Sequence, residues 1–183
     1  MTETTEIESL RARAGWYRLL AGVFAEEPRG EFLDALRGEA ALAALDALGV
    51  HLGPDFARAD REQIADILGC EYTMLFVAPG GFPPVESVRL QGGFRQGANS
   101  AVRAFYRAEG FAVQGGRFRV FEDHLSVELG FVAALLERQA AALEGGDAKG
   151  AQTAEKTIKR FWVQHLGRWV RGFASVVVRA AEQ

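Results

Sequence analysis

The chain has 183 residues, of which 49% are hydrophobic and 25% charged, with a formal net charge of −3. These values are typical of one soluble globular domain and give no reason to expect nucleic acid or an anionic membrane as a partner. Cys70 is the only cysteine, so an internal disulfide is excluded. The acidic residues 1–6 are the opposite of a secretory signal, and no apolar run reaches the roughly 20 residues that span a bilayer. We therefore expect a cytoplasmic protein without membrane insertion.

The charge is distributed unevenly along the chain. Residues 1–95 carry 9 Lys and Arg against 15 Asp and Glu, whereas residues 96–183 carry 12 against 9. An acidic N-terminal half can attract a basic peptide, although a charge run is more often a solvated face.

The first third of the chain predicts three helices. Apolar residues recur at helical spacing from an N-cap at Thr4 or Thr5 to about Ala25, where a nearby proline ends the pattern. Two short helices are expected at 31–36 and 39–48, separated by a glycine.

A helix over residues 61–77 follows a predicted turn at Gly53-Pro54, with Asp60 as its N-cap. One face of this helix is apolar, and a second apolar face broadens it, so we expect burial on more than one side. The first face contains Ile64, Leu68, Tyr72 and Leu75, and the second contains Ile67, Met74 and Val77.

The segment 79–97 cannot continue that helix. Three prolines and the pair Gly80-Gly81 favour a stiff extended stretch with a turning joint. We expect this segment to be a hinge, with residues 87–91 extended at most.

The C-terminal half predicts three long helices and a shorter one. A helix opens at Gly97 or Asn99 and ends at Gly110, and residues 111–121 are expected to be a loop, with a hairpin as the alternative. Asp123 is the expected cap of the longest helix, which reaches about residue 143. Its apolar stripe consists of Leu125, Leu129, Val132 and Leu136.

Asp147 starts the next helix after the pair Gly145-Gly146, and the last helix spans 168–181 with a hinge at Gly167. No strand pattern competes with these helices. The sequence therefore predicts an all-α fold.

Three motifs then carry a family resemblance. The first is Glu71-Tyr72-x-x-Leu75-Phe76 followed by Pro83-Pro84-x-Glu86-Ser87, the second is Glu122-Asp123-His124-Leu125 with Glu128-Leu129, and the third is Phe161, His165-Leu166, Trp169 and Phe173. In this order the motifs resemble the TorD/DmsD family, cytoplasmic chaperones that mature molybdenum enzymes carrying twin-arginine leaders. The chain departs from that pattern at Glu122, where the family commonly has proline, and at Arg168, where it has proline before the tryptophan.

The resemblance implies a single all-helical TorD-like domain of about nine or ten helices. It implies an N-terminal lobe at about 1–78, a hinge at about 79–97 and a C-terminal lobe at about 98–183. It further implies a chaperone rather than an enzyme, existing as a monomer or a domain-exchanged dimer. From the residues we expect no cofactor and no metal. The implied partner is the twin-arginine leader and apo form of the catalytic subunit of a molybdenum-cofactor oxidoreductase.

Such a leader has a basic stretch followed by an apolar one, so a site for it needs an apolar groove with nearby carboxylates. We expect the aromatic end of the helix and the proline-rich segment after it to form the groove. Four acidic residues are expected to supply the negative charge. The full set of expected peptide-binding residues is Glu71, Tyr72, Leu75, Phe76, Phe82, Pro83, Pro84, Glu86, Ser87, Asp123, His124 and Glu128.

Two other functions stay open at this point. One is a chaperone that serves a nitrate-reductase-type enzyme without a twin-arginine leader. The other is a small helical enzyme that uses His124 with Asp123 or Glu128, although no nucleophile elbow accompanies them and a closed metal site would lack further ligands. His51 is expected to be a surface residue and His165 a partly buried structural one.

Overall fold

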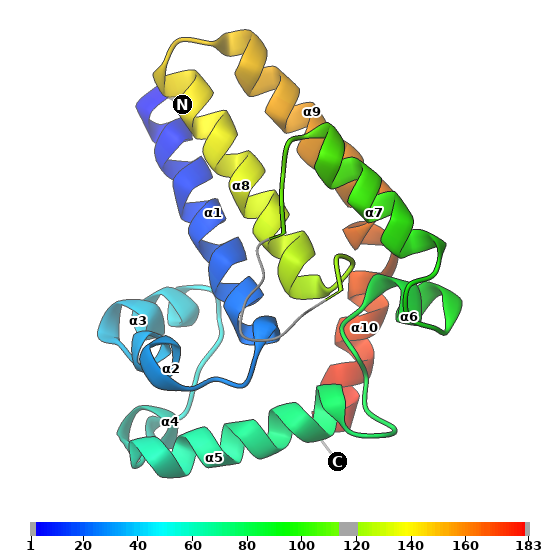
Figure 1. Cartoon of the computed structure of the whole chain (residues 1–183). Coiled ribbons are helices and arrows are strands. Elements are labelled where there is room, and N and C mark those ends of the chain that lie inside the picture. The colour runs from blue at the N-terminus through cyan, green and yellow to red at the C-terminus, as the bar shows by residue number, and fades with distance from the viewer. Residues whose placement is uncertain (1–2, 114–120, 182–183) are drawn as a thin grey trace. The chain divides into compact units, whose positions relative to one another are not determined.

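The structure, a computed structural model, describes residues 3–113 and 121–181, and within these ranges its regular elements are all helical, as expected (Figure 1). No helix in the described part has an apolar stretch long enough to cross a membrane. The elements are α1 (Glu3–Ala25), α2 (Gly30–Leu36), α3 (Glu39–Ala47), α4 (Pro54–Arg58), α5 (Arg61–Tyr72), the π-helical turn η1 (Thr73–Val77), α6 (Glu86–Gln91), α7 (Gly97–Ala108), α8 (Leu125–Glu144), α9 (Ala148–Gln164) and α10 (Leu166–Ala181).

The chain divides into two compact units that differ from the two expected lobes. One unit contains residues 1–25 and 82–183, and the other contains residues 26–81. Helix α1 therefore belongs to the same unit as the C-terminal helices. We call these the large unit and the small unit and describe each by itself.

The large unit is organised around α8, which lies between α1 and α9 (Figure 1). Helix α1 runs antiparallel to α8, since Arg11 pairs with Glu144 at one end and Arg18 with Glu137 further along. The expected stripe of α8 is confirmed, because its four leucine and valine residues are at most 6% exposed. This packing fixes the N-terminal end of α8, where the candidate site lies.

Aromatic rings fill the space between α7, α8 and α9. Phe131 lies 4.8 Å from Phe161, 4.8 Å from Tyr106 and 5.9 Å from Phe105, measured between ring centroids. Edge-to-face contacts of this kind add to the burial of large apolar surfaces. His165 closes the cluster, with its ring 5.0 Å from that of Phe161.

The junction between α9 and α10 is set by His165 and Gly167. His165 ends α9 with φ −127° and ψ −94°, so the break falls two residues before the expected hinge. Gly167 lies in the first turn of α10, where an added Cβ would come within 2.6 Å of the carbonyl oxygen of Trp162. Glycine is needed here for close backbone approach.

The small unit contains α2 to α5 and η1. Asp60 caps α5 as expected, accepting hydrogen bonds from the backbone N–H groups of Glu62 and Gln63. The α-helix ends at Tyr72, and the chain continues as the π-helical turn rather than as the expected α-helix to residue 77. Gly81 closes the turn: its N–H donates to the carbonyl of Ala78, and a Cβ would meet three carbonyl oxygens within 3.0 Å.

Several local predictions were wrong. Thr4 and Thr5 lie inside α1, which already begins at Glu3. The Gly53-Pro54 turn opens α4, because proline suits the first helical turn. Residues 86–91 form α6 instead of an extended segment. The expected loop at 111–121 falls largely outside the described residues.

Candidate functional site

The second half of the first motif and the start of the second motif are joined by backbone hydrogen bonds in the large unit. Val85 and His124 form an isolated antiparallel bridge. The N–H of Glu86 donates to the carbonyl of Asp123 at 2.9 Å, and the N–H of Leu125 donates to that of Pro84 at 2.8 Å. The bridge therefore brings Pro84–Ser87 directly beside Asp123–His124, although nearly 40 residues separate them in sequence.

Asp123 organises this junction from inside the protein. Its Oδ2 accepts from the N–H of Ser87 at 2.9 Å, in the first turn of α6, and its Oδ1 accepts from the side-chain amide of Asn99 at 2.8 Å. Tyr106 donates its hydroxyl to the carbonyl of Glu122 at 3.1 Å. Asp123 thus caps α6 from another part of the chain and does not cap α8, so the predicted cap was wrong.

His124 is the residue that caps α8. Its Nδ1 accepts from the N–H of Ser126 at 3.3 Å and lies 2.8 Å from the hydroxyl of that serine. Nδ1 must therefore carry a lone pair, and protonation there would remove the cap. Burial lowers the pKa of His124 to about 4, against a smaller opposing effect of the Asp123 charge. The imidazole is neutral at physiological pH.

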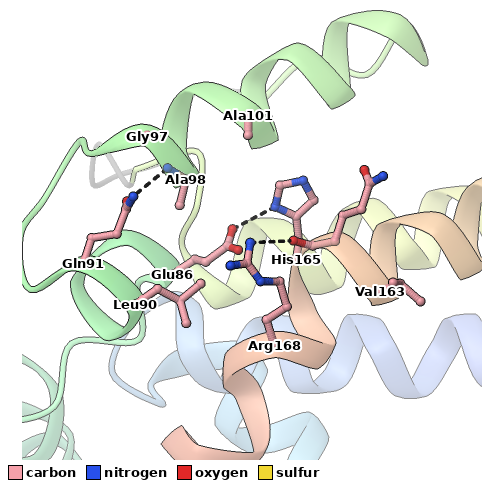
Figure 2. A pocket seen from close by; sticks show the side chains of 10 residues that line it. Glu86, Leu90, Gln91, Gly97, Ala98, Ala101, Val163, His165 and Arg168 are labelled. Carbon is pink, nitrogen blue, oxygen red and sulfur yellow. Dashed lines mark hydrogen bonds and ion pairs between the residues drawn. The ribbon is translucent and has the colours of Figure 1, made fainter.

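Two glutamates of the motifs lie beside residues of the third motif. Glu86 Oε2 is 2.9 Å from Nδ1 of His165, and both side chains are almost wholly enclosed (Figure 2). Trp169 donates its indole N–H to Glu128 Oε2 at 3.4 Å. Burial, followed by the nearby charge of Glu86, raises the pKa of Glu128 well above its usual range.

This burial bears on the predicted peptide contacts of the large unit. Glu86, Ser87, Asp123 and Glu128 are 0% exposed, and His124 is 8% exposed. A peptide on the surface does not reach these side chains as they lie in the structure. Their hydrogen bonds join α6, α8 and α10, and the peptide contacts expected of Asp123 and Glu128 stay predictions. Phe82 and Pro83 are half-buried, and Pro84 is buried.

Sequence reasoning missed the partners of this buried network. Asn99, Tyr106, His165 and Trp169 each supply a hydrogen-bonding group to it. The sequence held one signal of this pairing: Glu86 and His165 both belong to the motifs, and the chain has only three histidines. Their pairing depends on the fold, because 79 residues separate Glu86 from His165.

The remaining predicted residues lie in the small unit. Glu71 is exposed, whereas Tyr72, Leu75 and Phe76 are half-buried. The rings of Tyr72 and Phe76 meet edge to face at 5.1 Å. Burial, with smaller effects of Glu27 and Glu26, raises the pKa of Tyr72 to about 12, so its hydroxyl is neutral.

The second apolar face of α5 and η1 is exposed, contrary to the prediction that it is buried. Ile67 is 47% exposed, Met74 69% and Val77 66%. The free thiol of Cys70, one turn after Ile67, is exposed as well. We call Ile67, Cys70, Met74 and Val77 the exposed α5 face. The three large apolar residues lie within eleven residues of one another on α5 and η1, and exposed apolar residues that gather in one patch mark interaction surfaces.

The comparison with known families matches the sequence model described as "Nitrate reductase delta subunit" to residues 31–175, most of the chain. The chain belongs to the nitrate reductase delta subunit family. This is a TorD-like chaperone family, so the resemblance seen in the three motifs is confirmed at that level, and the family is one of maturation chaperones rather than of enzymes. The match includes the exposed α5 face and all three motifs.

The solved structure of a protein described as a redox enzyme maturation protein from Archaeoglobus fulgidus is 22% identical, with a TM-score of 0.48, over 80% of this chain and 91% of that one. Among curated proteins, none matches this chain significantly.

Proposed function

We propose that this chain is a cytoplasmic chaperone that binds the N-terminal leader of a molybdoenzyme catalytic subunit and holds the apo subunit until its cofactor is inserted. Membership of the nitrate reductase delta subunit family supports the maturation role. The observation that carries leader binding is the exposed α5 face on a strongly acidic unit.

Charge and apolar surface coincide in the small unit. Residues 26–81 contain four Arg and no Lys against eleven Asp and Glu, a net charge of −7. Asp66 and Glu71 are exposed and flank the exposed α5 face along the helix. A leader that is basic at its start and mildly apolar afterwards is complementary to such a surface in both respects.

The strength of binding follows from the disorder of a free leader. Ordering a disordered peptide costs several kcal/mol of the gross interaction energy. We therefore expect affinity in the micromolar range, which suits a chaperone that must release its client for export.

Binding is tested by calorimetry with synthetic leaders from twin-arginine molybdoenzymes. Met74→Asp places a charge at the centre of the exposed α5 face and should weaken binding of the matching leader at least about tenfold. The matched control is Val178→Asp, which changes a valine that is 56% exposed in α10 of the large unit. Equal weakening by both variants, or by neither, would contradict the assigned surface.

A second candidate is supported by the description of the matching family. The client would then be a nitrate-reductase-type catalytic subunit without a twin-arginine leader, and another N-terminal segment of it would supply the basic and apolar residues. Failure of all twin-arginine leaders, with binding to the N-terminal peptide of a nitrate-reductase-type catalytic subunit, would select this candidate.

A further inference from the structure

A cavity of about 780 Å³ lies in the large unit between α6, the start of α7 and the junction of α9 with α10 (Figure 2). Ala98 and Ala101 line it from α7. Figure 2 shows Leu90 of α6 and Val163 of α9 on opposite sides of the cavity, and these side chains are 37% and 74% exposed. A partner that fills the cavity would remove both from water, which favours binding.

Arg168 supplies the exposed charge of the cavity wall. Its Nη1 donates a 3.4 Å hydrogen bond to the carbonyl of Gln164, and no carboxylate of the described residues pairs with it. Such a long, exposed contact is weak, so the guanidinium can turn towards a ligand at little cost. Glu86 also lines the cavity, but its carboxylate is fully enclosed and faces Nδ1 of His165. An incoming group therefore meets a positive charge first.

The helices on this side of the cavity are strongly basic. Residues 148–181, which include α9 and α10, contain seven Lys and Arg and a single acidic residue, Glu155, a net charge of +6. Arg171 and Arg179 of α10 are exposed as well, and neither takes part in an ion pair within the part of the chain that the structure describes. This charge attracts an acidic partner and repels the basic start of a leader.

The polar groups of the cavity suit a carboxylate better than a phosphate. A guanidinium presents two parallel N–H groups that match the two oxygens of a carboxylate. A phosphate favours free N–H groups at a helix N-terminus, whereas at the start of α7 the N–H of Ala98 already donates to Oε1 of Gln91 at 3.1 Å. His165 adds its Nε2 to the lining, and because no described residue hydrogen-bonds to this atom, a peptide can use it.

We propose that this cavity binds a segment of the apo catalytic subunit in which a glutamate or aspartate stands next to an apolar residue. The carboxylate pairs with Arg168, and the apolar side chain lies between Leu90 and Val163. The inference rests on the proposed function, since the client supplies the segment. It gives the large unit a surface for an acidic part of the client, whereas the exposed α5 face of the small unit takes the basic and apolar leader.

The first test uses short overlapping peptides that span the catalytic subunit of a nitrate-reductase-type molybdoenzyme, with binding measured by fluorescence anisotropy. Arg168→Gln should weaken the peptides that use the cavity about tenfold, the effect of losing one charge-assisted pair. The matched control is Arg171→Gln, which removes the same charge from an exposed position of α10 outside the cavity wall. This control should change binding less than about twofold, because an exposed charge without direct contact is screened.

Altered peptides supply the second half of this test. In the peptides that respond to Arg168→Gln, replacing the acidic residue by its amide should weaken binding to the wild-type chain about tenfold and have no further effect on the variant. Equal effects of Arg168→Gln and Arg171→Gln on every peptide, or responsive peptides without an acidic residue, would overturn the proposal. Binding of these peptides in the absence of leader binding would contradict the leader site alone.

NMR locates the contact without knowledge of the client. A short capped peptide with one glutamate between two leucines, and its glutamine counterpart, are titrated into the wild-type chain while the methyl signals of Ala98, Ala101 and Ala104 are followed. Ala104 is an exposed residue of α7 outside the cavity wall. Shifts of Ala98 and Ala101 with the glutamate peptide, absent at Ala104 and reduced in Arg168→Gln, would support the cavity even if no leader binds. Unmoved signals, or equal shifts with both peptides, would refute it even if a leader binds elsewhere.

Discussion

His124 should make the large unit sensitive to acid. It caps α8 through an unprotonated Nδ1, and burial lowers its pKa from 6.5 to about 4. The unfolded chain therefore takes up a proton between about pH 6.5 and pH 4 that the folded chain does not bind. Stability from this residue is fully present above pH 6.5 and is lost as the pH falls towards 4.

The size of the effect follows from the same pKa values. One pKa unit corresponds to about 1.4 kcal/mol, so the interval from 6.5 to about 4 gives a maximum of roughly 3 kcal/mol. At pH 5 the loss relative to pH 7.5 should be about 2 kcal/mol. That is a large part of the stability of an ordinary domain, about 5–15 kcal/mol.

The perturbation that isolates this effect is His124→Asn, because asparagine is a good N-cap and does not titrate. Urea unfolding followed by circular dichroism at pH 7.5 and pH 5 gives the free energy of unfolding of both proteins. The wild-type chain should lose about 2 kcal/mol more than the variant between these pH values. Parallel pH dependence of the two proteins would refute the assignment of the cap and of its titration.

Three further predictions concern the same network and the helix ends. Glu128→Gln should stabilise the chain at neutral pH and reduce the loss of stability above about pH 4.5. The reason is that the raised pKa of Glu128 makes its ionisation unfavourable in the folded state. Urea unfolding at pH 5 and pH 8 checks this prediction. Gly167→Ala should lower the free energy of unfolding by roughly 1–3 kcal/mol, because the added methyl group clashes with the Trp162 carbonyl. Gly172→Ala, with open space around it, should raise the free energy of unfolding by up to about 1 kcal/mol. The reverse order would contradict the close approach of the backbone at the junction of α9 and α10. Asp60→Ala should destabilise α5 by about 1 kcal/mol, and unchanged hydrogen exchange of the amides of residues 62 and 63 would show that the cap is unimportant.

The long helices could be predicted because their signals are local. Asp60 and Asp147 cap helices where the sequence placed them, and the stripe of α8 is buried throughout. Periodicity and caps depend on residues within one or two turns, so one sequence is enough to read them.

The failures share a tertiary cause. Asp123 caps α6 from another segment, which left the next residue, His124, to cap α8. Helix α6 is short and follows three prolines, so its local sequence favours extended structure. The helix forms because the distant Asp123 carboxylate accepts a hydrogen bond from an N–H of its first turn. The π-helical turn is the exception, because the residues that close against it, 78–81, follow it directly in sequence.

In the candidate site, too, the residues could be named from the sequence, whereas their exposure could not. The motif residues were identified by their resemblance to those of a known family, but whether each faces solvent depends on the packing of other segments. Glu86 and Glu128 lie inside the protein, whereas Met74, expected in the core, is exposed. An apolar residue predicted as core and observed at the surface is a better indication of a binding surface than the motif alone.

The central claim is that this chain matures a molybdoenzyme through binding of its catalytic subunit. The most direct test is the molybdenum content of that subunit, purified after production with the wild-type chain, with Met74→Asp or without the chain. We predict a high molybdenum-to-protein ratio with the wild-type chain and a clearly lower ratio in the other two cases. Equal ratios in all three would contradict the maturation role, and a full ratio with Met74→Asp alone would show that the exposed α5 face is not the surface that acts.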